Sequence, residues 1–364
     1  MTTDIDASKT EAFVGRLFNA ALGTVDVLSV YVGDQLGLYK SLAEDGPATP
    51  IELAQRAGID PRYAREWLEQ QAVTEILEVD DPTKPEDERR YTLPATHAEA
   101  LIDPESPFSI APLARAIASI GPVLPKLMQA YRTGGGVDWT DYGSDGIEAQ
   151  GDFNRPWLVA QFGTEFLPLV PDVHARLQAG PPARVADVAC GVGWAGIAIA
   201  RAYPNVQVDG FDLDEMSISL ASKNAADAGV SDRVAFHVRD AGDPANEGAY
   251  DLVVVIEAIH DLSRPVEVLS AIRKMLAPGG CALIADERTQ DEFTVPGDEV
   301  ERFLYGASMF ICLPAAMGER PTAATGTVIR QSTMRRYAAE AGFSGFEVLE
   351  QIELPFLRFY RLTP

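Results

Sequence analysis

The 364-residue sequence has few of the residues that build disulfide frameworks, zinc clusters and nucleic-acid interfaces. Its three cysteines are widely spaced and include no CxxC pair: Cys190, Cys281 and Cys312. Only four histidines occur, and 30 basic residues stand against 54 acidic ones, which gives a formal net charge of −24. This composition argues against a disulfide-stapled or zinc-finger protein. It also argues against binding the phosphates of nucleic acids or an anionic membrane surface.

Long uncharged apolar runs are missing as well. No stretch of about 18 such residues predicts a membrane span, and the N-terminus lacks the basic and apolar regions of a signal peptide. We therefore expect a cytoplasmic protein. An apolar stripe at helical spacing runs from Phe13 to Leu28, and such a stripe needs a partner surface, either the rest of its domain or a second subunit.

Residues 49–71 predict a helix-turn-helix. The sequence TPIE (49–52) is a capping box with proline at the first helical position, Gly58 ends that helix, and Asp60 caps the next. Apolar segments at 76–79 and 90–93 flank a polar loop, so the whole region predicts a winged helix. Its second helix is about neutral, and residues 78–90 contain six acids and three bases. These charges favour a structural or dimerising module over a DNA-binding one.

From residue 185 onward, apolar segments alternate with helical ones, which predicts a parallel sheet with crossover helices. Two further apolar segments lie close together near the end and predict an antiparallel edge. We expect a doubly wound, Rossmann-like α/β sheet of seven strands, at 185–189, 206–212, 234–238, 252–257, 281–286, 346–354 and 356–362. The predicted division is a helical and winged-helix domain (1–104), a helical connector with a glycine-rich break at 133–146 (105–180), and the sheet domain (181–364).

Acidic residues end or follow four of these strands at one edge of the sheet: Asp187, Asp212, Asp240 and Glu257. A glycine loop beside them, with Gly191 and Gly193, can approach a ligand closely. Four carboxylates would repel the pyrophosphate of a nicotinamide cofactor. They suit a ligand that has a positive charge, a ribose and an adenine amine.

These segments resemble the motifs of class I S-adenosylmethionine-dependent methyltransferases. DVACGVG, GFDLDEMSISLA, RDAGD, YDLVVVIEAIHDL and LAPGG occur in the family's order. The resemblance implies S-adenosylmethionine as cofactor and S-adenosylhomocysteine as product. It implies cofactor contacts from Asp187, Gly191, Gly193, Asp212, Leu213, Asp240, Ala241 and Glu257. The N-terminal half resembles the winged-helix domain of small-molecule O-methyltransferases, which implies a homodimer, and the whole chain is similar to a group of actinobacterial methyltransferases.

His260 resembles the histidine of the HDW-type motif in O-methyltransferases, which implies a general base. An imidazole of near-neutral pKa accepts a proton from a hydroxyl as that hydroxyl attacks a methyl group. Asp261 or Glu257 is the candidate to orient the ring, although Leu262 replaces the usual tryptophan. Two other interpretations stay open: His260 lines the pocket without proton transfer, or it only caps a helix. A metal site built on a histidine pair needs a second histidine, and none follows His260, so we expect no metal.

Two segments are candidates for the substrate pocket because they carry aromatic and methionine side chains, which suit an apolar acceptor. These residues are Trp157, Phe162, Phe166, Phe303, Tyr305, Met309 and Phe310; a plain core role is the other interpretation. The function expected is methyl transfer to a small hydroxylated or aromatic molecule, with O-methylation favoured. Transfer to nitrogen or carbon, and a transcriptional regulator that senses the cofactor or a ligand, stay open.

Overall fold

The computed structural model describes residues 6–240 and 246–364. The chain divides into two compact units, Met1–Ala118 and Ser119–Pro364, and each is described by itself. The separate connector at 105–180 that the sequence suggested stays a prediction.

The first unit contains the expected winged helix. The Thr49 hydroxyl accepts a hydrogen bond from the Glu52 N–H at 3.3 Å, and the Glu52 carboxylate accepts one from the Thr49 N–H at 2.9 Å, which completes the predicted capping box. Gly58 ends that helix in the left-handed conformation, at φ +69°. The elements are α1 (Ala7–Gln35), α2 (Leu38–Glu44), α3 (Pro50–Ala57), α4 (Pro61–Val73), the antiparallel pair β1 (Glu78–Val79) and β2 (Tyr91–Thr92), and α5 (Ala95–Ile102).

The basic residues of α4 and of the wing are paired with acidic residues of the same unit. Each base has a carboxylate partner: Arg62 with Glu66, Arg65 with Glu86, Lys84 with Asp80, Arg89 with Glu69 and Arg90 with Glu52. Pairing leaves little net positive charge on the helix that a winged helix uses to enter the major groove.

Helix α1 is held at one end and exposed over the rest. Its C-terminal half contacts α4, where the Trp67 indole donates to the Ser29 carbonyl at 3.0 Å and the Gln70 amide donates to Asp26 at 3.1 Å. The apolar side chains of the predicted stripe are exposed: Phe13, Val14, Leu17, Phe18, Leu22, Val25 and Leu28. By length and composition alone, α1 is also apolar enough to cross a membrane.

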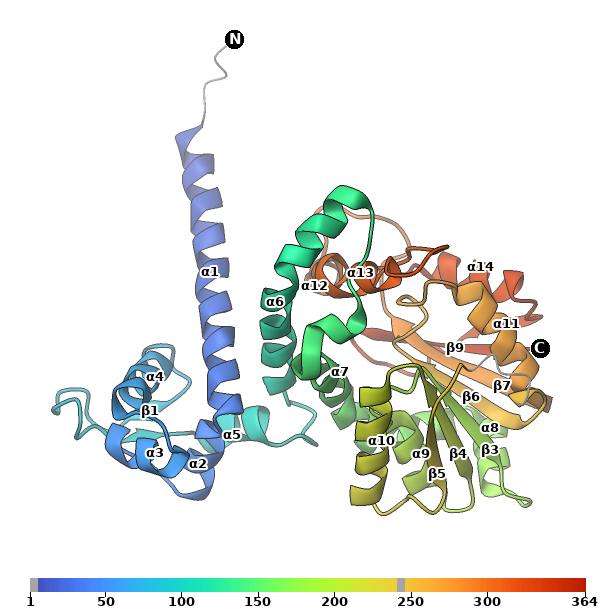
Figure 1. Ribbon diagram of the computed structural model, residues 1–364, viewed down its shortest axis with the longest axis horizontal. Helices are drawn as coiled ribbons and strands as arrows, with labels where there is room; N and C mark the ends of the chain where they lie inside the picture. Colours follow the sequence, from blue (N-terminus) through green and yellow to red (C-terminus); the bar gives the residue numbers. More distant parts are fainter. Residues whose placement is uncertain (1–5, 241–245) are drawn as a thin grey trace, which may run out of the picture. The chain divides into compact units, whose positions relative to one another are not determined.

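The second unit is built on the predicted seven-stranded sheet, in the order β5-β4-β3-β6-β7-β9-β8 (Figure 1). The five strands from β5 to β7 are parallel, and β9 and β8 add the antiparallel edge. The strands are β3 (Arg184–Val188), β4 (Gln207–Asp212), β5 (Val234–Val238), β6 (Tyr250–Ile256), β7 (Leu276–Glu287), β8 (Gly345–Val348) and β9 (Leu357–Thr363). The predicted segment 346–354 is therefore a strand only at residues 346–348.

Alternate residues of the central strands point into two cores on opposite faces of the sheet, as the period of a strand requires. Val185 packs with helices α8 (Pro171–Gln178) and α9 (Trp194–Ala202), while its neighbour Ala186 packs with α11 (Pro265–Met275) and α14 (Gln331–Glu340). The remaining helix between the strands is α10 (Glu215–Asp227). Because helices cover both faces of the sheet, the central strands appear in the sequence as continuous apolar segments.

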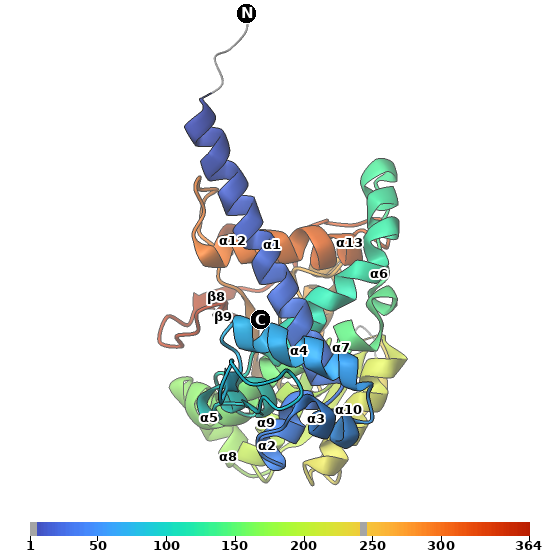
Figure 2. The ribbon, with the colours of Figure 1, turned by 90° about the vertical axis from the view of Figure 1, so that its left-hand side faces the viewer.

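Two further helical segments complete this unit. One comprises the 3₁₀ turn η1 (Trp139–Tyr142), α7 (Gly143–Trp157), the π-helical segment η2 (Leu158–Phe166) and the turn η3 (Leu167–Leu169). The other follows β7 and forms one continuous helical run of α12 (Glu299–Ala307), η5 (Ser308–Cys312) and α13 (Leu313–Ala316), seen in Figure 2. Helix α6 (Ala111–Thr133) joins the two units.

Candidate active site

The glycine loop after β3 has the conformation that its sequence suggests. Gly191 and Gly193 lie at φ +50° and +84°, in the region that disfavours side chains. A Cβ at Gly193 would lie 2.4 Å from the ring of Phe236, so this position also needs glycine for space. The Gly191 N–H donates to the Asp212 carboxylate at 2.9 Å, which ties the loop to the end of β4.

Asp187 lies below this loop rather than beside an open edge. Its side chain is 1% exposed, and its carboxylate accepts a hydrogen bond from the Gly196 N–H at 2.9 Å, in the first turn of α9. Burial raises the pKa of Asp187 to about 7, although the Gly196 bond opposes this shift. In the structure Asp187 therefore stabilises the first turn of α9.

The other predicted cofactor residues line the edge. Asp212 accepts a second bond, from the Asp214 N–H at 3.0 Å, and burial raises its pKa. Leu213 follows it and is 69% exposed, and Asp240 is exposed after β5. Ala241 lies outside the described residues.

Glu257 follows β6 in the left-handed region, at φ +49°. Two amides of α7 donate to its carboxylate, from Gln150 and Asn154, each at 2.7 Å. Asn154 in turn accepts a bond from the Trp157 indole at 2.8 Å. The chain of contacts connects the predicted substrate helix to the end of β6. Burial raises the pKa of Glu257 despite these amide bonds.

His260 is buried, and both of its ring nitrogens face carboxylates. Nδ1 lies 2.6 Å from Oδ1 of the fully buried Asp286, and Nε2 lies 3.3 Å from Oδ1 of Asp261. Burial disfavours the charged ring, but Asp261 and Asp286 outweigh burial and raise the pKa of His260 well above its usual value. Asp286, which the sequence argument did not consider, holds the ring through Nδ1, and Asp261, one of the two expected residues, faces Nε2.

Sequence reasoning missed three residues of this cluster: Asp286, Glu287 and Cys312. Asp286 and Glu287 end β7 at the edge that already gathered the other acids, so the same strand-end argument would have found them. Burial, with the nearby Glu257, raises the pKa of Glu287 well above its usual value. Cys312 comes from η5, and burial raises the pKa of its thiol to about 12. No sequence pattern places Cys312 here, because the contact depends on how the segment after β7 folds back.

The aromatic residues predicted for the substrate pocket occupy two environments. Trp157, Phe162 and Phe166 pack with Phe359 of β9, at ring-centre distances of 5.8–6.3 Å. Phe162 and Phe166 are buried within the core on that face of the sheet. A contact of these residues with an acceptor stays a prediction.

The second set lies on α12 and η5. Phe303, Tyr305 and Met309 are partly exposed, whereas Phe310 packs against a small core that includes Tyr142. The Tyr142 hydroxyl donates to the Phe310 carbonyl at 2.6 Å. A contact of these residues with an acceptor also stays a prediction.

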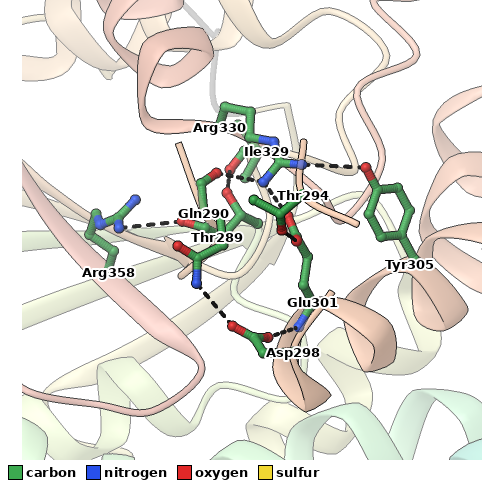
Figure 3. Close-up of polar contacts among 9 residues, drawn as sticks. All are labelled: Thr289, Gln290, Thr294, Asp298, Glu301, Tyr305, Ile329, Arg330 and Arg358. Carbon is green, nitrogen blue, oxygen red and sulfur yellow. Dashed lines mark hydrogen bonds and ion pairs between the residues drawn. The ribbon is translucent and has the colours of Figure 1, made fainter. Parts of the chain in front are cut away.

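A polar network connects α12 to the loop that precedes it and to Arg330, as Figure 3 shows. The Arg330 guanidinium pairs with the carboxylate of Glu301, whose side chain is 2% exposed, and also donates to the Tyr305 hydroxyl at 3.3 Å. Thr294 donates to Glu301 at 2.9 Å, and Asp298 caps α12 by accepting from the Glu301 N–H at 2.8 Å. These contacts fix the position of the helix that carries Phe303 and Tyr305.

Comparisons with known families assign the two halves of the chain. Residues 24–102 match an Rv2258c-like winged HTH domain, and residues 181–324 match a methyltransferase domain. These matches confirm the methyltransferase domain and the winged helix that the sequence suggested. Among curated proteins, the 27-O-demethylrifamycin SV methyltransferase of Amycolatopsis mediterranei (strain S699) is 32% identical over 104 residues. The match spans 28% of this chain and 38% of that relative's length.

Solved structures share the whole architecture at lower identity. Human N-acetylserotonin methyltransferase, in complex with SAM, is 15% identical with a TM-score of 0.69, covering 100% of this chain and 99% of that one. The mitomycin 7-O-methyltransferase MmcR is 18% identical with a TM-score of 0.66, covering 99% and 100%. At such identities the likeness establishes the fold.

Proposed function

We propose, from the matches of the chain to a methyltransferase domain and a winged HTH domain, that the protein transfers a methyl group from S-adenosylmethionine to a small hydroxylated acceptor. The observation that carries this proposal is the hydrogen bond from the Gly191 N–H to Asp212. It joins a glycine turn and a carboxylate at the edge where doubly wound sheets bind nucleosides. Both solved relatives named above are methyltransferases, and one is in complex with SAM.

The charges at this edge suit a cation better than a phosphate. Burial raises the pKa values of Asp212, Glu257 and Glu287, which means that their ionised forms are poorly solvated. A positive ligand beside them lowers the free energy of those ionised forms. S-adenosylmethionine supplies a methyl group on a positively charged sulfur, and it also has an ammonium group. We assign its ribose to Asp212, its adenine to the side of Leu213 and Asp240, and its amino-acid part to the glycine loop.

We assign the acceptor to the other end of the edge, near His260. Asp286 holds the ring through Nδ1, so we assign proton transfer from an acceptor hydroxyl to Nε2, which faces Asp261 at 3.3 Å. His260 acts as a base only in its neutral form, because an imidazolium has no free electron pair. Its raised pKa therefore predicts that activity rises with pH above neutrality. The exposed side chains of α12 and η5 favour an apolar acceptor.

The regulator interpretation receives no support from the charges of the winged helix, because the bases of α4 and of the wing already have acidic partners. We propose that the protein does not bind nucleic acid. Salt-sensitive retention on DNA at low ionic strength would contradict this statement.

Calorimetric titration with S-adenosylmethionine and S-adenosylhomocysteine tests the cofactor assignment. We expect micromolar binding by the wild type and its loss in Asp212→Ala. Glu215→Gln is the matched control, because Glu215 is an exposed carboxylate three residues away on α10 and should bind normally. Equal affinities for the wild type and Asp212→Ala would show that the cofactor does not bind at the end of β4.

We propose that α1 pairs with a second copy of the chain. Its exposed apolar side chains need cover, and its C-terminal half is already fixed to α4 through Ser29 and Asp26. Such an anchored helix, which also contains Arg16, fits a subunit contact in the cytoplasm better than a membrane span. Light scattering at micromolar concentration should give twice the chain mass of 39.3 kDa. A monomeric mass, or recovery of the protein in the membrane fraction, would argue against the pairing.

A further inference from the structure

We propose that His260, Asp261 and Cys312 bind one divalent transition-metal ion, and that the ion is zinc. Their ligand atoms, Nε2, a carboxylate oxygen and Sγ, all lie within 4.8 Å of one another. Ligands that share a tetrahedral zinc at bond lengths of 2.0–2.3 Å lie roughly 3.3–3.7 Å apart. The separation of 3.3 Å between Nε2 and Oδ1 of Asp261 already has this value.

The donor set selects the metal. One imidazole, one thiolate and one carboxylate are the three ligand types that zinc takes in proteins, whereas calcium and magnesium take oxygen ligands. The sequence argument against a metal considered only a second histidine as the missing ligand. In the structure the sulfur of Cys312, which the sequence argument did not consider, lies within 4.8 Å of the ligand atoms of His260 and Asp261. Coordination removes the proton of the thiol, since a metal-bound thiol is deprotonated.

A buried oxygen of Asp261 also supports this site. Its Oδ1 atom makes no hydrogen bond among the described residues: Nε2 of His260 lies 3.3 Å away, but it has no proton to donate while the neutral ring keeps its proton on Nδ1. A buried carboxylate oxygen without a donor is costly. A metal ion between Oδ1, Nε2 and Sγ would supply the missing partner.

The surroundings of His260 match those of a metal ligand. Histidine ligands usually donate their second ring N–H to a carboxylate, which fixes the tautomer and the ring orientation. Asp286 does this at 2.6 Å, and its Oδ1 is itself held by the Glu287 N–H at 2.9 Å. The proton on Nδ1 leaves the electron pair of Nε2 directed at Asp261 and Cys312.

Three protein ligands leave the fourth zinc position open, as in catalytic zinc sites. Asp261 keeps 38% of its side chain exposed, so the site can be reached from solvent. Resting on the proposed function, the open position would bind the acceptor oxygen and favour its loss of a proton to solvent. A metal-bound Nε2 cannot accept a proton. The general-base role proposed for His260 therefore belongs to the metal-free protein, and in the zinc-bound protein the acceptor would lose its proton to solvent.

Metal content and cobalt spectroscopy test the site without any substrate. The full-length protein is loaded with Zn²⁺ or Co²⁺, dialysed, and measured for bound metal and for the near-ultraviolet absorption of a cobalt–thiolate bond. We expect roughly one ion per chain in the wild type, as for a three-ligand site. Cys312→Ser should lose the thiolate band and at least about tenfold in metal affinity, and Asp286→Asn should also bind more weakly, by about 10–100-fold.

Cys281→Ser is the matched control, because Cys281 lies within β7 and is not among the grouped ligands. It should keep the band and the stoichiometry. Circular dichroism and calorimetric binding of S-adenosylhomocysteine show whether each variant is folded. A wild type that retains no metal from micromolar Zn²⁺, or a thiolate band that persists in Cys312→Ser, would overturn the proposal. Loss of cofactor binding with the metal retained would instead contradict only the proposed function.

Discussion

Replacing Asp187 by asparagine is expected to stabilise the cofactor-free protein at alkaline pH. The buried carboxyl has a pKa of about 7 in the folded state, while its ordinary value is 3.8. Between pH 5 and pH 7 the unfolded carboxyl is therefore ionised and the native one still holds its proton. Over this range the free energy of unfolding falls by about 1.4 kcal/mol per pH unit, about 3 kcal/mol in all. The stability that this carboxyl contributes is fully present below pH 3.8 and is lost above pH 7.

Asparagine removes this charge but keeps an oxygen that can accept the Gly196 N–H. The assay is urea unfolding of the wild type and Asp187→Asn at half-unit steps from pH 5 to pH 8.5, without cofactor. The difference between the two proteins isolates Asp187 from the other groups that titrate in this range. We expect the free energy of unfolding of the variant to rise relative to that of the wild type as pH rises. The difference between the two should become constant above pH 7. A difference that does not change with pH would refute the reasoning, because it would mean that Asp187 is ionised throughout.

Other predictions concern single contacts. Glu301→Ala leaves Arg330 without its buried partner and should cost about 3–5 kcal/mol by urea unfolding, whereas the double variant with Arg330→Met should recover part of this loss. Gly193→Ala meets both a positive φ and the ring of Phe236, so its melting temperature should fall and S-adenosylhomocysteine binding should weaken; an unchanged melting temperature would contradict this. Asp60→Ala removes the cap of α4, whose carboxylate accepts the Arg62 N–H at 2.8 Å, and should destabilise the first unit by about 1 kcal/mol in thermal melting; no change would show that the cap is dispensable.

The sequence predicted the sheet well because each strand is buried on both faces and is separated from the next by a helix. The five parallel strands were found within a few residues, and so were the capped helices α3 and α4. The edge that gathers the acids followed from the parallel order alone, since the carboxyl ends of parallel strands lie on one side.

The contacts between distant segments did not follow from the sequence. Glu257 accepts hydrogen bonds from Gln150 and Asn154, which lie more than 100 residues earlier in the chain. Local spacing does not encode such pairings. The glycine-rich stretch near residue 133 shows the same limit, since its composition suggested a flexible break. In the structure Gly136 lies so close to the backbone of Gly318 that a Cβ would be 2.2 Å from its nitrogen, and the Val137 N–H donates to the Pro314 carbonyl at 3.0 Å. Close backbone approach accounts for glycine at residue 136.

The two proposals assign different cations to the two halves of one acidic edge. Parallel topology brings Asp212 to the β4 side and Asp261 and Asp286 to the β6–β7 side, and every one of these acids lies in poorly solvating surroundings. His260 is the single imidazole in the second group, and one positive ring does not balance the acids that face it. A cofactor sulfonium beside Asp212 and a zinc ion on Asp261 would each offset part of this excess. Each ligand should therefore raise the melting temperature when added alone, and the two together should raise it further, because each cation relieves a different group of carboxylates.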